Sequence, residues 1–339
     1  MFDVSRIEAN VVALAKAARD AGVTALFAVK SFPHPVVREL AAAHLAGFDA
    51  ASAGEMAELA PRADRILSVV DPSGAAVTAS WPGRLIVGVE TPEQAAAAPA
   101  RAEIAIRLSA SRGDRDPAVG AILDGSGRRR SRFGLDVEPT RRRANIASIV
   151  AAAGHRPIGV HVHHGPVTAT TGERFVATAR DALADLEIEP RFIDLGGAWH
   201  GIADLSRALV ELRAAVPRSI ELIVEPGRLV SAGAGRATGT VTTARSLDDR
   251  ELRVTDLSRV CHLRWSQIAL VSRAPHPGRG RATTWVGPTC YEEDVLGDWI
   301  VDPDEFPVGA GVAFTGVTGY ALAWNTGFGG VPPATVVVR

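Results

Sequence analysis

Short apolar runs, rich in β-branched residues, recur eight times along the first two thirds of the chain. They occupy residues 26–29, 48–52, 66–70, 85–89, 104–108, 158–162, 192–195 and 220–224. Alanine-rich stretches, most with helical spacing, lie before or between them, at 5–21, 35–46, 53–60, 92–100, 140–153, 172–186 and 202–216. Continuous apolar strands that alternate with helices are typical of a parallel sheet buried on both faces. The pattern predicts an α/β fold, a (β/α)8 TIM-like barrel, with helix 5–21 in the place of an eighth outer helix.

The pattern changes after Gly235. The segments TGTVTTARSL, ELRVTDLSRV, RATTWVGPT, GVAFTGV and ATVVV are short, rich in threonine and valine, and separated by glycine, proline or aspartate turns. They predict an all-β domain, a β-sandwich or barrel-like fold. We therefore expect a barrel domain at residues 1–234 and a β domain at 235–339.

Composition narrows the class of partner. The 339 residues are 47% hydrophobic and 22% charged, and the net charge of −1 gives no field that attracts nucleic acid. No apolar run reaches the roughly 18 residues of a membrane span. Two cysteines, Cys261 and Cys290, cannot form a disulfide scaffold, and the start MFDVSRIEAN lacks a secretory pattern, so we expect a cytoplasmic protein. The arginine runs 128–130 and 141–143 are interpreted as solvated faces.

Polar and glycine-rich residues follow four of the strands, at the end where barrel enzymes collect their catalytic groups. They are Lys30 in ALFAVK, His161, His163 and His164 in IGVHVHHG, Gly196 and Gly197 in FIDLGG, and residues 225–228 in ELIVEPGR. We therefore expect the polar residues that follow these four strands to lie together at one end of the barrel, which we call its mouth.

Lys30 is the candidate nucleophile. A lysine directly after a buried strand is costly as an ion, so burial is expected to lower its pKa and make the amine more reactive. The alternative is that Lys30 reaches water or pairs with an acid such as Glu55. The residue alone does not decide between these interpretations.

The other mouth residues suit a heterocycle that carries a phosphate. Glu225 could hold a protonated ring nitrogen, while Arg228 and the glycines offer donors to a phosphate. Metal binding is the rival for HVHH, because His161 and His163 share a strand face. No second cluster with ligand spacing completes such a site, so we expect no metal.

Together these segments resemble the fold-type III, alanine-racemase-like enzymes that use pyridoxal 5'-phosphate (PLP). Within them they resemble the ornithine, arginine, diaminopimelate and siderophore-type amino acid decarboxylases. ALFAVK followed by GFDAASAGE looks like the family's AVK and G-x-D-x-A-S-x-x-E segments, IGVHVHHG is similar to H-x-H-x-G-S, and FIDLGG and EPGR match the phosphate-loop and ring-nitrogen motifs. The order AVK, EPGR, GPTC is more specific than any single motif.

The resemblance assigns roles residue by residue. It implies a Schiff base on Lys30, a catalytic ring-stacking role for His163 and a ring-nitrogen contact for Glu225. It also implies cofactor contacts by Asp49, Arg107, Gly196, Gly197, Gly227, Arg228 and Tyr320, with Ser52 and Glu55 near the lysine. GPTCYEEDVLGD resembles the segment that enters a neighbouring subunit's active site, which makes Cys290 the proton donor, Asp294 a contact of the substrate's distal end, and the protein a homodimer.

The chain also departs from the family pattern. Pro166 replaces a serine, Ala198 a third loop glycine, Phe32 an asparagine and Tyr291 an acid, TGY replaces GAY, and the N-terminal segment is short. These departures bear on phosphate affinity and substrate choice.

The resemblance implies decarboxylation of an amino acid, either a basic or diamino acid or a carboxylated intermediate, as in polyamine or siderophore biosynthesis. The sequence does not decide the substrate or its stereochemistry. One alternative is a racemase of the same fold, but EPGR argues against it because alanine racemases place an arginine at the ring nitrogen. The other is a non-catalytic PLP-binding regulatory homologue, which the departures favour and which the retained Lys30, Cys290 and Asp294 oppose.

Overall fold

The computed structural model describes residues 1–109, 122–123, 129–135, 139–163, 165, 167, 169–184 and 186–339. The chain forms two compact units. The barrel unit consists of Val11–Lys30 and Pro35–Leu229, and the β unit of Met1–Asn10, Ser31–His34 and Val230–Arg339. The first residues thus group with the C-terminal part of the chain, which the sequence did not suggest.

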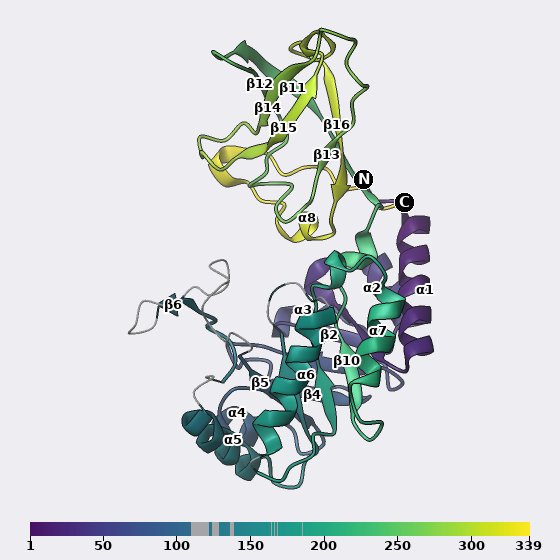
Figure 1. The fold of residues 1–339 in the computed structure, drawn as a ribbon, viewed down its shortest axis with the longest axis vertical. Coiled ribbons are helices and arrows are strands. Elements are labelled where there is room, and N and C mark those ends of the chain that lie inside the picture. The colour runs from purple at the N-terminus through teal and green to yellow at the C-terminus, as the bar shows by residue number, and fades with distance from the viewer. Residues whose placement is uncertain are drawn as a thin grey trace. The chain divides into compact units, whose positions relative to one another are not determined.

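The barrel unit contains a closed barrel of eight parallel strands, as predicted (Figure 1). The order around the barrel is β1-β10-β9-β8-β5-β4-β3-β2. The strands are β1 (Thr24–Ala28), β2 (Gly47–Ala50), β3 (Ile66–Val69), β4 (Leu85–Val89), β5 (Glu103–Leu108), β8 (Ile158–Val162), β9 (Phe192–Asp194) and β10 (Glu221–Val224). Every predicted run overlaps a strand, because each is mostly apolar and packs both on the helices and on the barrel interior.

Helices cover the outside of the barrel, mostly where alanine-rich stretches predicted them. They are α1 (Val4–Ala21), α2 (Pro35–His44), α3 (Ala53–Ala57), α4 (Pro92–Ala97), α5 (Pro139–Ala153), α6 (Ala169–Ala184) and α7 (Leu205–Ala214). Thr91 caps α4, and its hydroxyl and the Gln94 side chain form a reciprocal capping box. Turns replace a helix between β3 and β4, where the Asp71 carboxylate accepts hydrogen bonds from Ser73 and Ala76. A two-stranded sheet, β6 (Ile122–Leu123) and β7 (Arg129–Arg130), follows β5.

An ion-pair network joins strands at the amino-terminal end of the barrel. Arg84, just before β4, contacts Glu103 on β5 at 2.8 Å through two nitrogens and Glu221 on β10 at 2.7 Å. Thr24, the first residue of β1, donates to Glu221 at 2.6 Å. The layer above is apolar and contains Leu26, Ile86, Ala105, Phe192 and Ile223. Ion pairs therefore connect the strands at the amino-terminal end of the barrel, and the candidate catalytic residues lie at the opposite, carboxyl-terminal end.

The β unit contains a six-stranded mixed sheet of order β13-β16-β11-β12-β14-β15. Its strands are β11 (Gly235–Ser246), β12 (Glu251–Thr255), β13 (Ala269–Leu270), β14 (Arg281–Val286), β15 (Val295–Val301) and β16 (Gly311–Val317). The predicted strand ATVVV is wrong, because in residues 334–338 only Val338 forms a bridge, with Phe2. Among the described residues, no helix is both long and apolar enough for a bilayer span.

Candidate active site

Lys30 follows β1 within a one-turn 3-10 helix, η1 (Val29–Ser31). Its Nζ lies 2.6 Å from Oδ2 of Asp49, which is on the neighbouring strand β2. The Lys30 side chain is 44% exposed, whereas that of Asp49 is 1% exposed. Lys30 is therefore half exposed and paired with an acid, as in the alternative interpretation of the sequence, but the acid is Asp49 and not Glu55.

Two carboxyl groups meet beside this ion pair. Glu225, directly after β10, is 3% exposed, and Asp194, the last residue of β9, is 1% exposed. Their side chains hydrogen-bond each other. Burial, reinforced by the neighbouring carboxyl groups, raises the pKa of Glu225 well above its usual range, and burial raises the pKa of Asp194 to about 7. The pair therefore retains a proton more readily than free carboxyl groups do, and the backbone N–H of Gly196, which donates to Asp194 Oδ1 at 2.8 Å, favours Asp194 as the ionised member and Glu225 as the protonated one.

His161, on β8, completes this cluster. Its Nε2 lies 3.8 Å from Glu225 Oε2, and its ring lies 6.4 Å from that of His163 at an interplanar angle of 17°. Burial and the positive charge of Arg107 hold the pKa of His161 well below its usual value, so the imidazole is neutral. Ligand atoms of His161, Asp194 and Glu225 all lie within 4.8 Å of one another. Positive charge on Lys30 and Arg107 acts on this cluster and disfavours a metal ion there.

Arg107, on β5, faces the same end of the barrel. It is 9% exposed, its Nε lies 3.9 Å from Glu90 Oε1, and its guanidinium lies 4.5 Å from the centre of the Phe133 ring. Burial lowers the pKa of Arg107, and the charges of Glu90, Glu225 and Asp49 oppose that shift. The predicted position of Arg107 near the lysine is consistent with this shared environment.

The glycine loop after β9 is closely packed. Gly196 has φ of 64°, and a Cβ there would lie 2.6 Å from the Cβ of His163. At Gly197 a Cβ would lie 3.0 Å from the carbonyl oxygen of Glu225. Ala198 occupies the left-handed region with φ of 65°, which a third glycine would adopt without strain. The loop therefore lets backbone approach both His163 and Glu225.

Arg228 has a partner that the sequence did not reveal. Its guanidinium donates to Nε2 of His200 at 3.1 Å, and His200 lies in the one-turn helix η2 (Trp199–Gly201) just after the glycine loop. Burial and then the charge of Arg228 lower the pKa of His200. Neutral His200 therefore holds Arg228, a predicted phosphate-binding residue, close to the glycine loop.

The orphaned atoms at this end of the barrel fit a cationic ring. Glu225 Oε1 and Asp49 Oδ1 are buried and have no hydrogen-bond partner among the described residues. An unpaired buried acceptor costs about 1–3 kcal/mol. A protonated ring nitrogen would supply the missing donor to Glu225, and Lys30 would supply the amine. The residues present therefore fit PLP.

The β unit carries the predicted proton donor and the predicted substrate contact. Cys290 is exposed, and Cys261 is buried. Asp294 is 3% exposed and accepts hydrogen bonds from Ser258 Oγ at 2.9 Å, Arg259 N at 2.6 Å and Thr289 Oγ1 at 2.7 Å. Asp294 thus joins residues 258–260 to the loop that carries Cys290. The predicted contact of Asp294 with the substrate stays a prediction.

Tyr320 begins the short helix α8 (Tyr320–Ala323) of the β unit. Its ring meets that of Trp265 edge-on, with centroids 5.1 Å apart, and Trp265 also contacts Trp324 at 5.2 Å. Trp265 has φ of 61°, a strained value for a bulky residue. The predicted phosphate contact of Tyr320 stays a prediction.

Sequence reasoning missed Asp194 and His200. The motif FIDLGG already contains the signal for Asp194, because an aspartate at the end of an apolar strand and just before two glycines indicates a carboxylate at the barrel mouth. His200 gave no comparable signal. His164 and Pro166, both part of the predicted motifs, lie outside the described residues.

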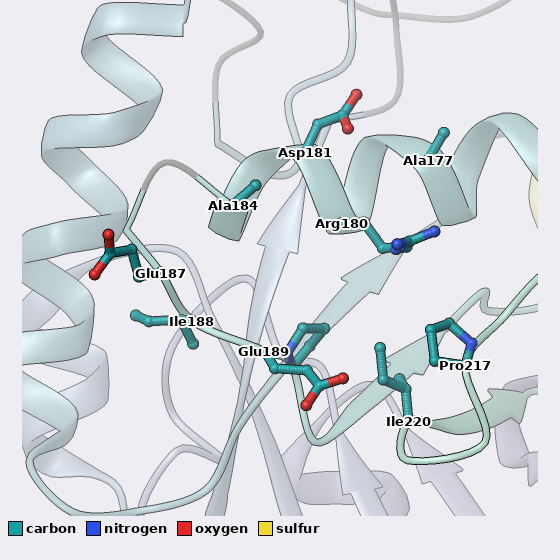
Figure 2. Close-up of a pocket in the computed structure, with 10 residues that line it drawn as sticks. Ala177, Arg180, Asp181, Ala184, Glu187, Ile188, Glu189, Pro217 and Ile220 are labelled. Carbon is teal, nitrogen blue, oxygen red and sulfur yellow. The ribbon is translucent and has the colours of Figure 1, made fainter.

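A separate groove lies on the barrel unit away from these groups (Figure 2). It has a volume of about 550 Å³ and is lined by residues of α6 and of the loops that lead into β9 and β10, among them Arg180, Asp181 and Glu189. These loops precede their strands, so the groove is at the opposite end from Lys30 and Glu225.

Comparisons with known proteins place the fold. No family model matches the chain, and no curated protein does. The arginine decarboxylase of Paramecium bursaria Chlorella virus, bound to agmatine, matches with a TM-score of 0.79 and 16% identity over 100% of this chain and 95% of that one. The Vibrio vulnificus lysine/ornithine decarboxylase complexed with putrescine matches with a TM-score of 0.76 and 19% identity, over 100% of this chain and 93% of that one. The Campylobacter jejuni carboxynorspermidine decarboxylase complexed with norspermidine matches with a TM-score of 0.72 and 15% identity, over 98% of this chain and 90% of that one. At these identities the comparison confirms the predicted fold, a barrel with a second β domain.

Proposed function

We propose that this protein is a PLP-dependent amino acid decarboxylase in which Lys30 holds the cofactor as a Schiff base. The observation that carries the proposal is the Lys30–Asp49 ion pair beside Glu225, whose buried Oε1 has no partner among the described residues. The chain has only one other lysine, Lys16, which pairs with Asp20 on the exposed face of α1. Lys30 is therefore the only lysine of this sequence at the site.

The cofactor supplies an electron sink for the electron pair that remains on the substrate α-carbon when carbon dioxide leaves. Asp49 orients the Lys30 amine, and Glu225 would hold the ring nitrogen. Gly196, Gly197, Gly227 and Arg228 are the proposed phosphate contacts, and His163 would contact the ring. Each of these residues follows or lies near the carboxyl end of a barrel strand, where such groups converge.

The solved structures of similar fold support the reaction type. They are decarboxylases named for arginine, lysine/ornithine and carboxynorspermidine, and the three structures contain agmatine, putrescine and norspermidine, respectively. We therefore propose a basic or diamino acid, or a carboxylated polyamine-like intermediate, as the substrate class. A racemase of this fold is less well supported, because the residue that we assign to the ring nitrogen, Glu225, is a carboxylic acid and not an arginine.

The β unit would complete the site in a homodimer. We propose that Cys290, which is exposed, donates the proton that replaces the carboxylate, and that Tyr320 binds the cofactor phosphate. Asp294 holds the loop of Cys290 in place through its hydrogen bonds to Ser258, Arg259 and Thr289.

The test is product analysis with purified protein and added PLP. Arginine, lysine, ornithine, diaminopimelate and carboxynorspermidine are each assayed for carbon dioxide release and for change of enantiomer. We expect carbon dioxide with at least one of them, loss of release in Lys30→Ala, and full release in Lys16→Ala. Interconversion of enantiomers without carbon dioxide would establish a racemase, and PLP binding without either product would establish a regulatory homologue.

A further inference from the structure

Asp194 is a buried acidic residue of the mouth to which the proposed function gives no task. It is fixed at two points, since its Oδ1 accepts a hydrogen bond from Gly196 N at 2.8 Å and its carboxyl group also hydrogen-bonds Glu225. Glu225 in turn donates its backbone N–H to the Gly196 carbonyl at 2.8 Å. Gly196 of the glycine loop thus holds both the Asp194 carboxyl group and the Glu225 backbone in place.

Charged groups from three other parts of the barrel act on this pair. They are the carboxylate of Asp49 on β2, the ammonium of Lys30 after β1 and the guanidinium of Arg107 on β5, and the imidazole of His161 on β8 beside them is neutral. Two anions beyond Glu225 therefore face two cations. A proton on Glu225 limits the negative charge in the cofactor-free site, and a cationic ring can take over that task.

We propose that Asp194 is a positioning residue that acts on the cofactor's ring nitrogen through Glu225. In the cofactor-free protein Asp194 accepts the hydrogen bond of protonated Glu225, and in the PLP-loaded protein it remains beside Glu225 as a second anion. This rests on the proposed function. In the step, the O–H bond of Glu225 breaks and an N–H bond forms on the ring nitrogen. Asp194 stays ionised throughout, so protons and charge balance without any further group.

The first test uses cofactor-free protein and infrared spectroscopy with glutamate labelled by ¹³C at its side-chain carboxyl. The wild type at neutral pH is expected to show the carbonyl stretch of a buried protonated glutamic acid, and this band is expected to disappear when PLP is added. In Asp194→Asn the amide would donate to Glu225 and keep it ionised, so the band should be absent from the start. Asp71→Asn is the matched control, because Asp71 is a buried carboxylate after β3 whose hydrogen bonds, within the described part of the chain, go to Ser73 and Ala76 of its own turn, and it should keep the wild-type band.

The second test follows the ring nitrogen directly, by ¹⁵N NMR of the protein loaded with ¹⁵N-labelled PLP. Two charges about 5 Å apart at an effective dielectric constant of about 20 interact strongly enough to move a pKa by about two pH units. We expect the ring nitrogen of Asp194→Asn to lose its proton about two pH units lower than in the wild type, and that of Asp71→Asn to match the wild type.

The outcomes separate the two proposals. An absent band in the free wild type, a band that survives PLP binding, or an unchanged ring-nitrogen titration in Asp194→Asn overturns the role of Asp194 and leaves the proposed function standing. If Asp194→Asn does not fold, the infrared band of the wild type with and without PLP is the deciding measurement. Failure of PLP to bind overturns the proposed function, and the role of Asp194 toward the ring with it.

Discussion

Replacing Arg84 with methionine should destabilise the barrel strongly. Arg84 makes contacts of 2.7–2.8 Å to Glu103 and Glu221, and the three side chains are 27%, 18% and 29% exposed. Methionine keeps most of the apolar stem but leaves two partly buried carboxylates facing each other. Breaking a buried pair costs about 3–5 kcal/mol, and because these groups keep some solvent we expect about 3 kcal/mol. At an m-value of about 3 kcal/mol/M, the urea midpoint should fall by about 1 M.

The assay is urea unfolding followed by circular dichroism. The matched control is Arg207→Met, which removes an exposed Arg207–Glu211 pair with side chains 76% and 43% exposed and should leave the midpoint nearly unchanged. The double variant Arg84→Met/Glu221→Gln should recover part of the loss, because it removes one of the repelling charges. Equal midpoints for Arg84→Met and Arg207→Met would refute the idea that this network holds the barrel closed.

Three further predictions concern the mouth of the barrel. Gly196→Ala should raise the PLP Kd at least about tenfold, measured by fluorescence titration, because its Cβ would lie 2.6 Å from His163 in a left-handed conformation; unchanged affinity would contradict the packing. His161 is neutral when folded and protonates below pH about 6.5 when unfolded, so it should cost about 1.4 kcal/mol of stability per pH unit as pH falls below 6.5. His161→Gln should flatten that slope in urea titrations, and an equal slope would argue against a buried neutral histidine. Ala198→Gly should leave stability unchanged or raise it by up to about 1 kcal/mol in the same assay, and a clear loss would contradict strain at φ of 65°.

The sequence predicted the barrel well because its strands are continuous apolar runs and its helices are alanine-rich. It failed where the local pattern was ambiguous. β15 was not predicted because Gly297 and Asp298 interrupt its apolar residues, and ATVVV was predicted although only Val338 pairs. A short β-branched segment carries no information about whether a neighbouring strand edge is available.

The candidate site was predictable where chemistry and position coincide in one short motif, as at Lys30 and Glu225. The pairing of Asp194 with Glu225 was not, because the parallel pairing of β9 with β10 brings together two residues that are far apart in sequence. The contact between His200 and Arg228 has the same origin. Local motifs indicated which residues matter, and only the fold showed which of them touch.

The central claim, a covalent bond between Lys30 and PLP, is tested most directly by borohydride reduction of the loaded protein and peptide mapping. The chain contains two lysines, Lys16 and Lys30, so the reduced phosphopyridoxyl group can be assigned to one of two side-chain amines. We expect it on the peptide that contains Lys30, in the wild type and in Lys16→Ala, and on no peptide of Lys30→Ala. Recovery of the label at Lys16, or equal labelling of Lys30→Ala, would contradict the account.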